Sequence, residues 1–183
     1  MAFLAELWLP ILAAAVLVFL ASSVIHVALP IHKGDHARLP DESCLGPLAD
    51  AAPGSYVFPF AQSMDEVRTE PFQAKLDAGP VGFLTLMPKG SFGMGKSLTL
   101  WFLQSLVVGT FVAYLASLAL ESGAPYLQVF RVTGTAAFLG YGFAHVHDSM
   151  WKGAPWAITF KFMFDGLVYA LVTAGTFAWL WPA

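Results

Sequence analysis

The sequence has few charged residues: 11% of its 183 residues are Asp, Glu, Lys or Arg, whereas soluble domains usually contain about 25%. Hydrophobic residues make up 57% of the chain, which is more than a core of this size can bury. This composition excludes an ordinary soluble enzyme and a disordered tail. The formal net charge of -3 supplies no basic field for a polyanion, so no nucleic acid is expected as a partner.

Cysteine is equally scarce. Cys44 is the only one, so the chain cannot form an intramolecular disulfide. A single thiol in a connecting segment is expected to have no function of its own and suits a reducing compartment. The sequence also lacks a nucleophile elbow, an aspartyl dyad and a dinucleotide fingerprint, and these absences favour a non-enzymatic protein.

What the sequence does contain is long apolar runs. A helix of about 20 apolar residues crosses the ~30 Å hydrocarbon core of a bilayer. Four runs reach this length and predict transmembrane helices, over 7–29, 97–120, 126–147 and 156–181. We therefore expect an all-α integral membrane protein, a four-transmembrane-helix bundle that forms a single domain over 1–183. Its first two helices would be joined by a partly ordered cytoplasmic loop, 30–96, of roughly 65 residues.

The distribution of basic residues predicts the orientation. Lys and Arg concentrate in the 30–96 loop, with Lys152 in the turn before the fourth run. Basic residues mark the cytoplasmic side of a membrane protein, so the N-terminus and the C-terminus are expected on the periplasmic side. Trp residues near both ends of the predicted spans agree with this four-span arrangement.

Local patterns within the loop predict some ordered structure. Ser63, followed three residues later by Glu66, is typical of a helix N-terminus and predicts a short helix over 63–76. Residues 56–58 and 81–87 are predicted to be extended. The run Gly90–Ser97 fits the phosphate-loop pattern, but no parallel sheet fits in this loop. We therefore interpret it as a turn in which Ser97 caps the next helix.

The histidines are the strongest sign of chemistry. In the predicted topology all five lie near the cytoplasmic boundary, together with carboxylates from the third and fourth runs. Neutral imidazole and carboxylate are ligands for Zn²⁺ or a redox metal. The candidate metal ligands are His26, His32, His36, His145, His147, Asp148 and Asp165. A haem b with axial ligands His26 and His145 is the less favoured cofactor.

Other interpretations of the same residues remain open. An ionised Asp at mid-span costs on the order of 2.5 to 3.5 kcal/mol on insertion scales, so Asp165 needs a partner, and Lys161 one turn earlier predicts a buried ion pair. A hydrogen-bonded network of His26, His145 and Asp165 would then only fix the helix register. An oligomeric ion or proton pathway is a further alternative. It would be lined by polar residues within the predicted spans: Arg131, Thr135, Asp165 and Thr176.

Small residues recur every four positions in three of the runs. Such stripes let transmembrane helices approach closely. They are Ser105, Gly109, Ala113 and Ser117; Ala136, Gly140 and Ala144; and Gly166, Ala170, Ala174 and Ala178. They predict packing within the bundle, or contacts with other membrane-complex subunits or a second copy. The leading functional prediction is accordingly a small accessory or structural membrane subunit that acts through protein–protein contacts.

Three segments carry a resemblance. SSVIHVALPIHKGDHARLPDE at 22–42, MGKSL at 94–98 and FDGLVYALVTAGTFAWLWP at 164–182 resemble small bacterial inner-membrane proteins known only as hypothetical proteins. The resemblance spans most of the chain and implies a bacterial origin, a single domain and a multi-pass location in the inner (cytoplasmic) membrane. It implies no activity and no site residues.

Overall fold

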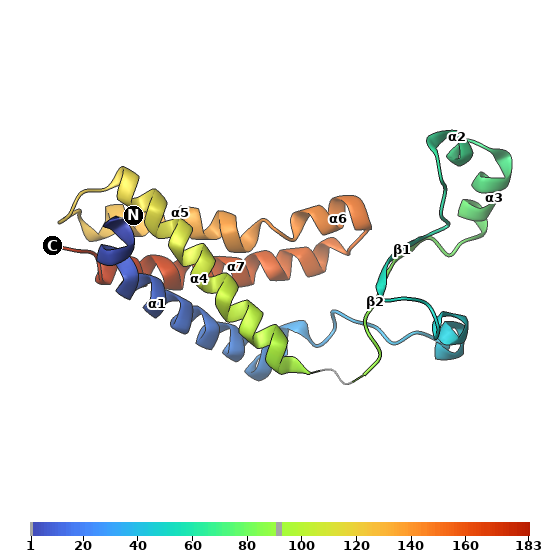
Figure 1. Cartoon of the computed structure of the whole chain (residues 1–183), viewed down its shortest axis with the longest axis horizontal. Helices are drawn as coiled ribbons and strands as arrows, with labels where there is room; N and C mark the ends of the chain where they lie inside the picture. Colours follow the sequence, from blue (N-terminus) through green and yellow to red (C-terminus); the bar gives the residue numbers. More distant parts are fainter. Residues whose placement is uncertain (1, 91–92) are drawn as a thin grey trace. The chain divides into compact units, whose positions relative to one another are not determined.

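The computed structural model describes residues 2–90 and 93–183, which are mostly helical (Figure 1). They form two compact units. The helical unit comprises residues 2–36, 93–150 and 154–183, and the loop unit comprises residues 37–90 with 151–153. Four long helices build the helical unit: α1 (Ala2–Ser23), α4 (Met94–Ala119), α5 (Tyr126–Gly142) and α7 (Trp156–Trp179).

These four helices pack in a ring. α1 contacts α4 and α7, and α5 contacts the same two helices, with its longest contact along α7. Val18, Val112, Val129 and Phe177, one from each helix, are fully buried between them. Apolar side chains form most of this interior, as expected where helix association depends on van der Waals contact, and a few polar side chains, Asp165 among them, are buried with them.

The small-residue stripes of α4 and α7 face the inside of this ring and pack against neighbouring helices. Ser105, Gly109 and Ala113 are buried on α4, and a Cβ added at Gly166 of α7 would lie 2.5 Å from the Cα of Gly142 on α5. The stripe predicted on α5 is not buried in this way. Its Gly140 and Ala144 are exposed, and the helix turns a different face inward, with Val129, Thr133, Ala137 and Tyr141.

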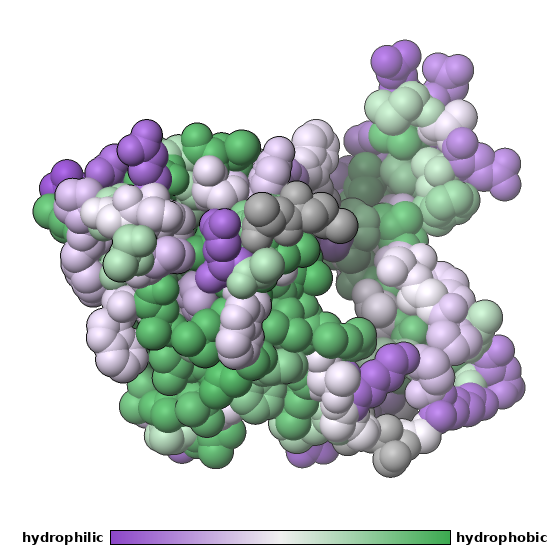
Figure 2. Space-filling model, turned by 60° about the vertical axis from the view of Figure 1, so that its left-hand side comes forward, coloured by the Kyte–Doolittle hydropathy of each residue, from purple (hydrophilic) through white to green (hydrophobic). Residues whose placement is uncertain are grey.

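Within the part of the chain that the structure describes, three helical stretches are long and apolar enough to cross a membrane: Phe3–Ala28, Met94–Ala119 and Trp156–Trp179. Large apolar side chains cover their outward surfaces, as in Leu20, Phe111 and Phe160, which are 54%, 64% and 60% exposed. Figure 2 shows apolar residues over much of the visible surface of the helical unit. An exposed apolar surface of this extent marks a protein that contacts lipid rather than water, so the structure indicates a membrane protein.

The third predicted span, 126–147, is not a single helix. α5 ends at Gly142 after 17 residues, and the short helix α6 (Val146–Lys152) follows after a turn. The glycines at 140 and 142 lower the helix propensity of this stretch by about 1 kcal/mol each relative to Ala. The close approach of α7 at Gly142 is a second reason why the chain changes direction here.

The end of α1 departs from regular α-helix. Val24–Ala28 form the π-helical turn η1, in which the Leu29 N–H donates to the Val24 carbonyl five residues earlier, at 3.2 Å. Pro30 has no N–H to continue the pattern, and the chain turns into the 3₁₀ helix η2 (Pro30–His32). π turns occur frequently at functional sites, and this one carries His26.

The loop unit is not entirely helical. A 3₁₀ helix η3 (Glu42–Leu48) precedes strand β1 (Gly54–Phe58), which pairs antiparallel with β2 (Gly82–Leu86) so that Tyr56 faces Leu84 in the register. The two extended stretches are thereby confirmed, although their pairing departs from an all-α fold. The predicted 63–76 helix is split into α2 (Met64–Val67) and α3 (Glu70–Ala78). The cap at its start is confirmed, since the Ser63 hydroxyl accepts from the Glu66 N–H.

The phosphate-loop-like run is described only in part, because residues 91 and 92 lie outside the described residues. α4 begins at Met94 with Gly93 as its N-cap residue. The prediction that Ser97 caps this helix is therefore wrong, because Ser97 already lies inside the first turn.

Candidate metal centre

Asp165 is a buried carboxylate on a membrane-type helix. It lies in the first half of α7 and is 1% exposed. Tyr169 lies four residues later on the same buried face of α7. Gly166, which follows Asp165 directly, lets the backbone of α5 pack closely against α7. A carboxylate in such a place needs compensating partners, because burial of an unpaired charge is strongly unfavourable.

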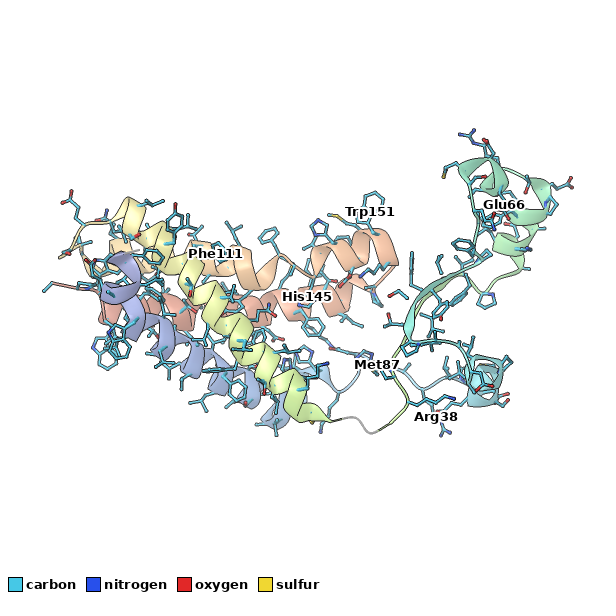
Figure 3. The ribbon with its side chains drawn as sticks, in the orientation of Figure 1. Arg38, Glu66, Met87, Phe111, His145 and Trp151 are labelled. Carbon is cyan, nitrogen blue, oxygen red and sulfur yellow. The ribbon has the colours of Figure 1, made fainter. Side chains whose placement is uncertain are left out.

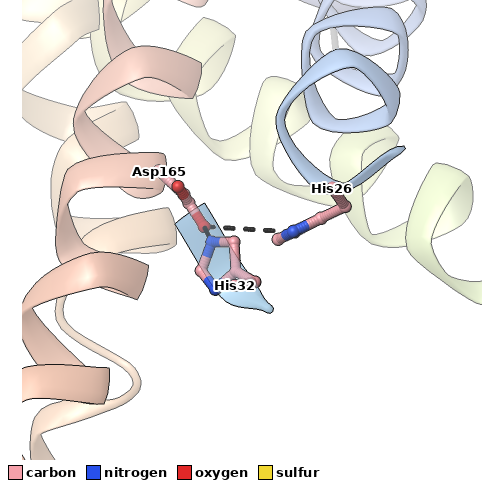
Figure 4. Close-up of side chains that lie close together, drawn as sticks. All are labelled: His26, His32 and Asp165. Carbon is pink, nitrogen blue, oxygen red and sulfur yellow. Dashed lines mark ion pairs between the residues drawn. The ribbon is translucent and has the colours of Figure 1, made fainter. Parts of the chain in front are cut away.

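Two histidines from the end of α1 reach this carboxylate. His26 comes from the π turn η1 and His32 from η2, and both point at Asp165 (Figure 4). The His32 Nε2 lies 2.9 Å from Asp165 Oδ2, and the His26 Nε2 lies 3.9 Å from the same oxygen. One candidate ligand atom from each of the three residues falls within 4.8 Å of the other two. We call His26, His32 and Asp165 the HHD cluster.

Asp35 supports this cluster from behind His32. The His32 Nδ1 lies 2.5 Å from Asp35 Oδ2, and the Lys161 ammonium donates to Asp35 Oδ1, also at 2.5 Å. Asp35 is 4% exposed at its side chain. The hydrogen bond from Lys161, followed by that from His32, holds the pKa of Asp35 below its usual range. The carboxylate is therefore ionised at neutral pH and favours the His32 tautomer with its proton on Nδ1.

This tautomer leaves the Nε2 lone pair of His32 facing Asp165. Among the described residues, His32 Nε2 and both carboxylate oxygens of Asp165 have no hydrogen-bond partner, although all three atoms are buried. The 2.9 Å approach of Nε2 and Oδ2 would bring a lone pair against a carboxylate. A cation between the two atoms, or a second proton on His32, removes this conflict.

The other predicted ligands lie outside the HHD cluster. His36 and His147 are exposed, and Asp148 is half-buried on α6. His145, labelled in Figure 3, lies in the turn between α5 and α6, where its ring stacks on Phe162 with centroids 4.5 Å apart. The predicted set of seven is thus reduced to three, and the haem prediction with His26 and His145 remains untested.

The ion pair expected between Lys161 and Asp165 is not the one that forms. Lys161 instead pairs with Asp35, because the chain folds back after Pro30 and brings Asp35 to α7 one turn before Asp165. Sequence reasoning did not assign Asp35 to the site. The signal for it was its position between His32 and His36, directly after an apolar run.

The four residues of the predicted ion pathway do not share one buried face. Arg131 and Thr135 are exposed on α5, so they do not share a buried path with Asp165. Thr176 is buried, but its hydroxyl donates to the Val172 carbonyl within its own helix. These placements give the ion-pathway prediction no support.

A cavity of about 330 Å³ adjoins the HHD cluster. His26 and Asp165 line one part of it, and His145 lines another. Its remaining wall includes Trp101, Tyr141 and Tyr169, whose rings contact one another with centroid distances of 5.5 to 6.0 Å.

Comparisons with family models, with curated proteins and with solved structures find no match to this chain. The assignment of the site therefore depends on the geometry of the residues described above.

Proposed function

We propose that this protein is a membrane protein that binds one divalent first-row transition-metal ion, such as Zn²⁺ or a redox metal, through the HHD cluster. The observation that carries the proposal is that one ligand atom from each of His26, His32 and Asp165 lies within 4.8 Å of the other two. The His32 Nε2 and both Asp165 oxygens are buried and have no hydrogen-bond partner among the described residues, while His26 reaches them from the exposed side, with 39% of its side chain accessible. Two imidazoles and one carboxylate form a donor set used by Zn²⁺ and by non-haem iron sites.

The arrangement around His32 favours a metal over a purely structural network. Histidines that bind metals usually donate their second ring N–H to a carboxylate, which fixes the tautomer and the ring orientation. Asp35 occupies this position. The charges agree as well: Asp35, Asp165 and Lys161 sum to -1 (-1 - 1 + 1), so a cation at the cluster is electrostatically favourable.

The same proposal includes a four-span topology in the bacterial inner membrane. α1, α4 and α7 are the three candidate spans, and α5, with α6 following it, packs along α7 as the fourth. The Lys and Arg distribution supports a cytoplasmic loop unit and periplasmic termini. The HHD cluster would then lie near the cytoplasmic boundary, where metal ions from the cytoplasm have access.

The experiment is metal analysis of the full chain, purified in mild detergent without an affinity tag. After loading with Zn²⁺ and dialysis, we expect about one ion per wild-type chain. His32→Ala and Asp165→Asn are each expected to lose it. His36→Ala, a matched control at an exposed histidine of the same segment, is expected to retain it.

Two outcomes would reject the metal proposal. A wild-type protein that retains no ion after loading would leave the HHD cluster as a protonated hydrogen-bond network. Equal retention by wild type and His32→Ala would show that the ion binds elsewhere.

The accessory-subunit role remains a prediction. The buried stripes of α4 and α7 are occupied by contacts inside the ring, whereas Gly140 near the end of α5 and Ala144 in the turn after it are exposed. Partners that co-purify in mild detergent would support this role.

A further inference from the structure

The HHD cluster supplies only three ligands. Zn²⁺ in proteins is usually four-coordinate, and sites with three protein ligands keep the remaining position for water or substrate. Within the described residues, the group of His, Cys, Asp and Glu side chains that converges here has three members. His145 also lines the cavity, but it does not belong to this group. A metal held here would therefore have an open coordination position.

The open coordination position would face the cavity beside the HHD cluster. Two of the three cluster residues, His26 and Asp165, line the cavity of about 330 Å³. This volume lies at the lower end of the range for small-molecule sites, which is about 300 to 1,000 Å³. It fits a ligand of one or two rings rather than a long chain.

Part of the cavity wall is aromatic, with rings tilted or edge-on to one another. Trp101, Tyr141 and Tyr169 contact one another at ring-centroid distances of 5.5, 5.7 and 6.0 Å, and Phe162 closes another part of the lining. Aromatic walls favour a planar, largely apolar body through stacked or edge-to-face contact.

One polar atom of this wall is unsatisfied. The Trp101 Nε1–H is buried and has no hydrogen-bond partner among the described residues, whereas the Tyr169 hydroxyl lies within hydrogen-bonding reach of the Ser22 side chain. Tyr169 as a whole is 5% exposed. Because an indole N–H can only donate, the ligand that satisfies it must carry an acceptor such as a carbonyl or carboxylate oxygen.

We propose that the cavity is a ligand-binding site for a small planar-ring molecule whose oxygen donor completes the coordination of the metal. The ring lies among Trp101, Tyr141 and Tyr169, and the oxygen donor faces the metal held by His26 and Asp165. This inference depends on the proposed metal site and adds to it the chemical class of the ligand.

The test uses Co²⁺, whose visible spectrum reports its coordination, and two hydroxamates. Benzohydroxamate carries a metal-binding group on a planar ring, and acetohydroxamate carries the same group without the ring. We expect both to change the visible spectrum of the Co²⁺-loaded full-length protein, and benzohydroxamate to bind at least tenfold more tightly.

Variants assign the binding to this cavity. Tyr169→Phe keeps the ring and removes the hydroxyl, so it should weaken benzohydroxamate by about twofold to tenfold. Trp101→Phe should reduce the preference for benzohydroxamate over acetohydroxamate. Tyr126→Phe, at an exposed tyrosine outside the cavity, is the matched control and should leave both affinities unchanged.

The outcomes separate the two proposals. A chain that binds no Co²⁺ rejects the metal site itself. If the chain binds Co²⁺ but neither hydroxamate changes its spectrum, the metal-site proposal stands and the proposal of an open coordination position is rejected. Equal affinities for the two hydroxamates in the wild type would overturn the planar-ring class.

Discussion

His32 links Asp35 to Asp165 in the candidate site. Its Nδ1 contacts Asp35, which Lys161 neutralises, and its Nε2 faces Asp165. Both ring nitrogens face carboxylates, so Asp35 holds the ring in the orientation that turns Nε2 toward Asp165. Substitutions behind His32 should therefore affect metal affinity without removing a ligand.

Asp35→Asn tests this orienting role. We expect it to weaken metal binding by about 10- to 100-fold, the usual effect of losing a carboxylate that orients a histidine ligand. Competition with a chromophoric chelator measures the affinity. Asp77→Asn, at an exposed position of α3, is the control, and a wild-type affinity in Asp35→Asn would contradict the orienting role of Asp35.

Lys161→Met tests the ion pair between Lys161 and Asp35. Removal of the ammonium leaves the Asp35 carboxylate, 4% exposed, without its cation, so we expect a lower Tm in detergent. In the Asp35→Asn background the same substitution should cost less, because no charge is left uncompensated. Equal losses of Tm in the two backgrounds would show that the two residues are not coupled.

At the scale of the elements, the close contact of α5 and α7 defines the position of Asp165. Gly166 follows Asp165 directly, and the backbone of Gly142 occupies the space where a side chain at 166 would lie. The π turn η1 has a similar role at the end of α1, because it carries His26 and leads into the reversal at Pro30. The site thus depends on two irregular backbone features rather than on helix periodicity.

Gly166→Ala should disrupt the contact between α5 and α7. The added Cβ would lie 2.5 Å from the Gly142 Cα, so the helices must separate, at a cost of about 1 to 3 kcal/mol. Gly175→Ala in the same helix is the matched control, since its Cβ would meet nothing closer than the Tyr126 hydroxyl at 3.9 Å. Thermal unfolding in detergent should show a lower Tm for Gly166→Ala only; equal Tm values would contradict the close approach.

At the scale of the whole molecule, the ring of four helices and the proposed topology make a further prediction about access. The exposed Cys44 belongs to the loop unit and is the only cysteine in the chain. In the proposed orientation it faces the cytoplasm, whereas the turn between α4 and α5 faces the periplasm.

A membrane-impermeant maleimide distinguishes the two sides. We expect Cys44 to react in inverted vesicles and to be protected in intact spheroplasts. A variant that combines Cys44→Ser with Ser122→Cys, an exposed position in the α4–α5 turn, should show the opposite pattern. Labelling of Cys44 in intact spheroplasts would contradict the proposed topology.

Much of the fold was predictable from local patterns. The apolar runs predicted α4 and α7 to within three residues of their ends, and α1 to within six, since membrane-type hydropathy is a sum over neighbouring residues. The Ser63 cap was predictable for the same reason, because it depends on residues three apart. The end of α5 at Gly142 was not, because it depends on the approach of another helix.

The sequence by itself determined that the chain is mostly helical and apolar, since these properties belong to individual residues and short segments. Only the tertiary structure decided which of them meet. Lys161 pairs with Asp35, 126 residues earlier in the chain, and His26 and His32 lie close to Asp165, whereas His36 and His147 do not belong to this group. These pairings arise from the reversal of the chain at Pro30 and its packing on α7, and no spacing along the sequence encodes that contact directly.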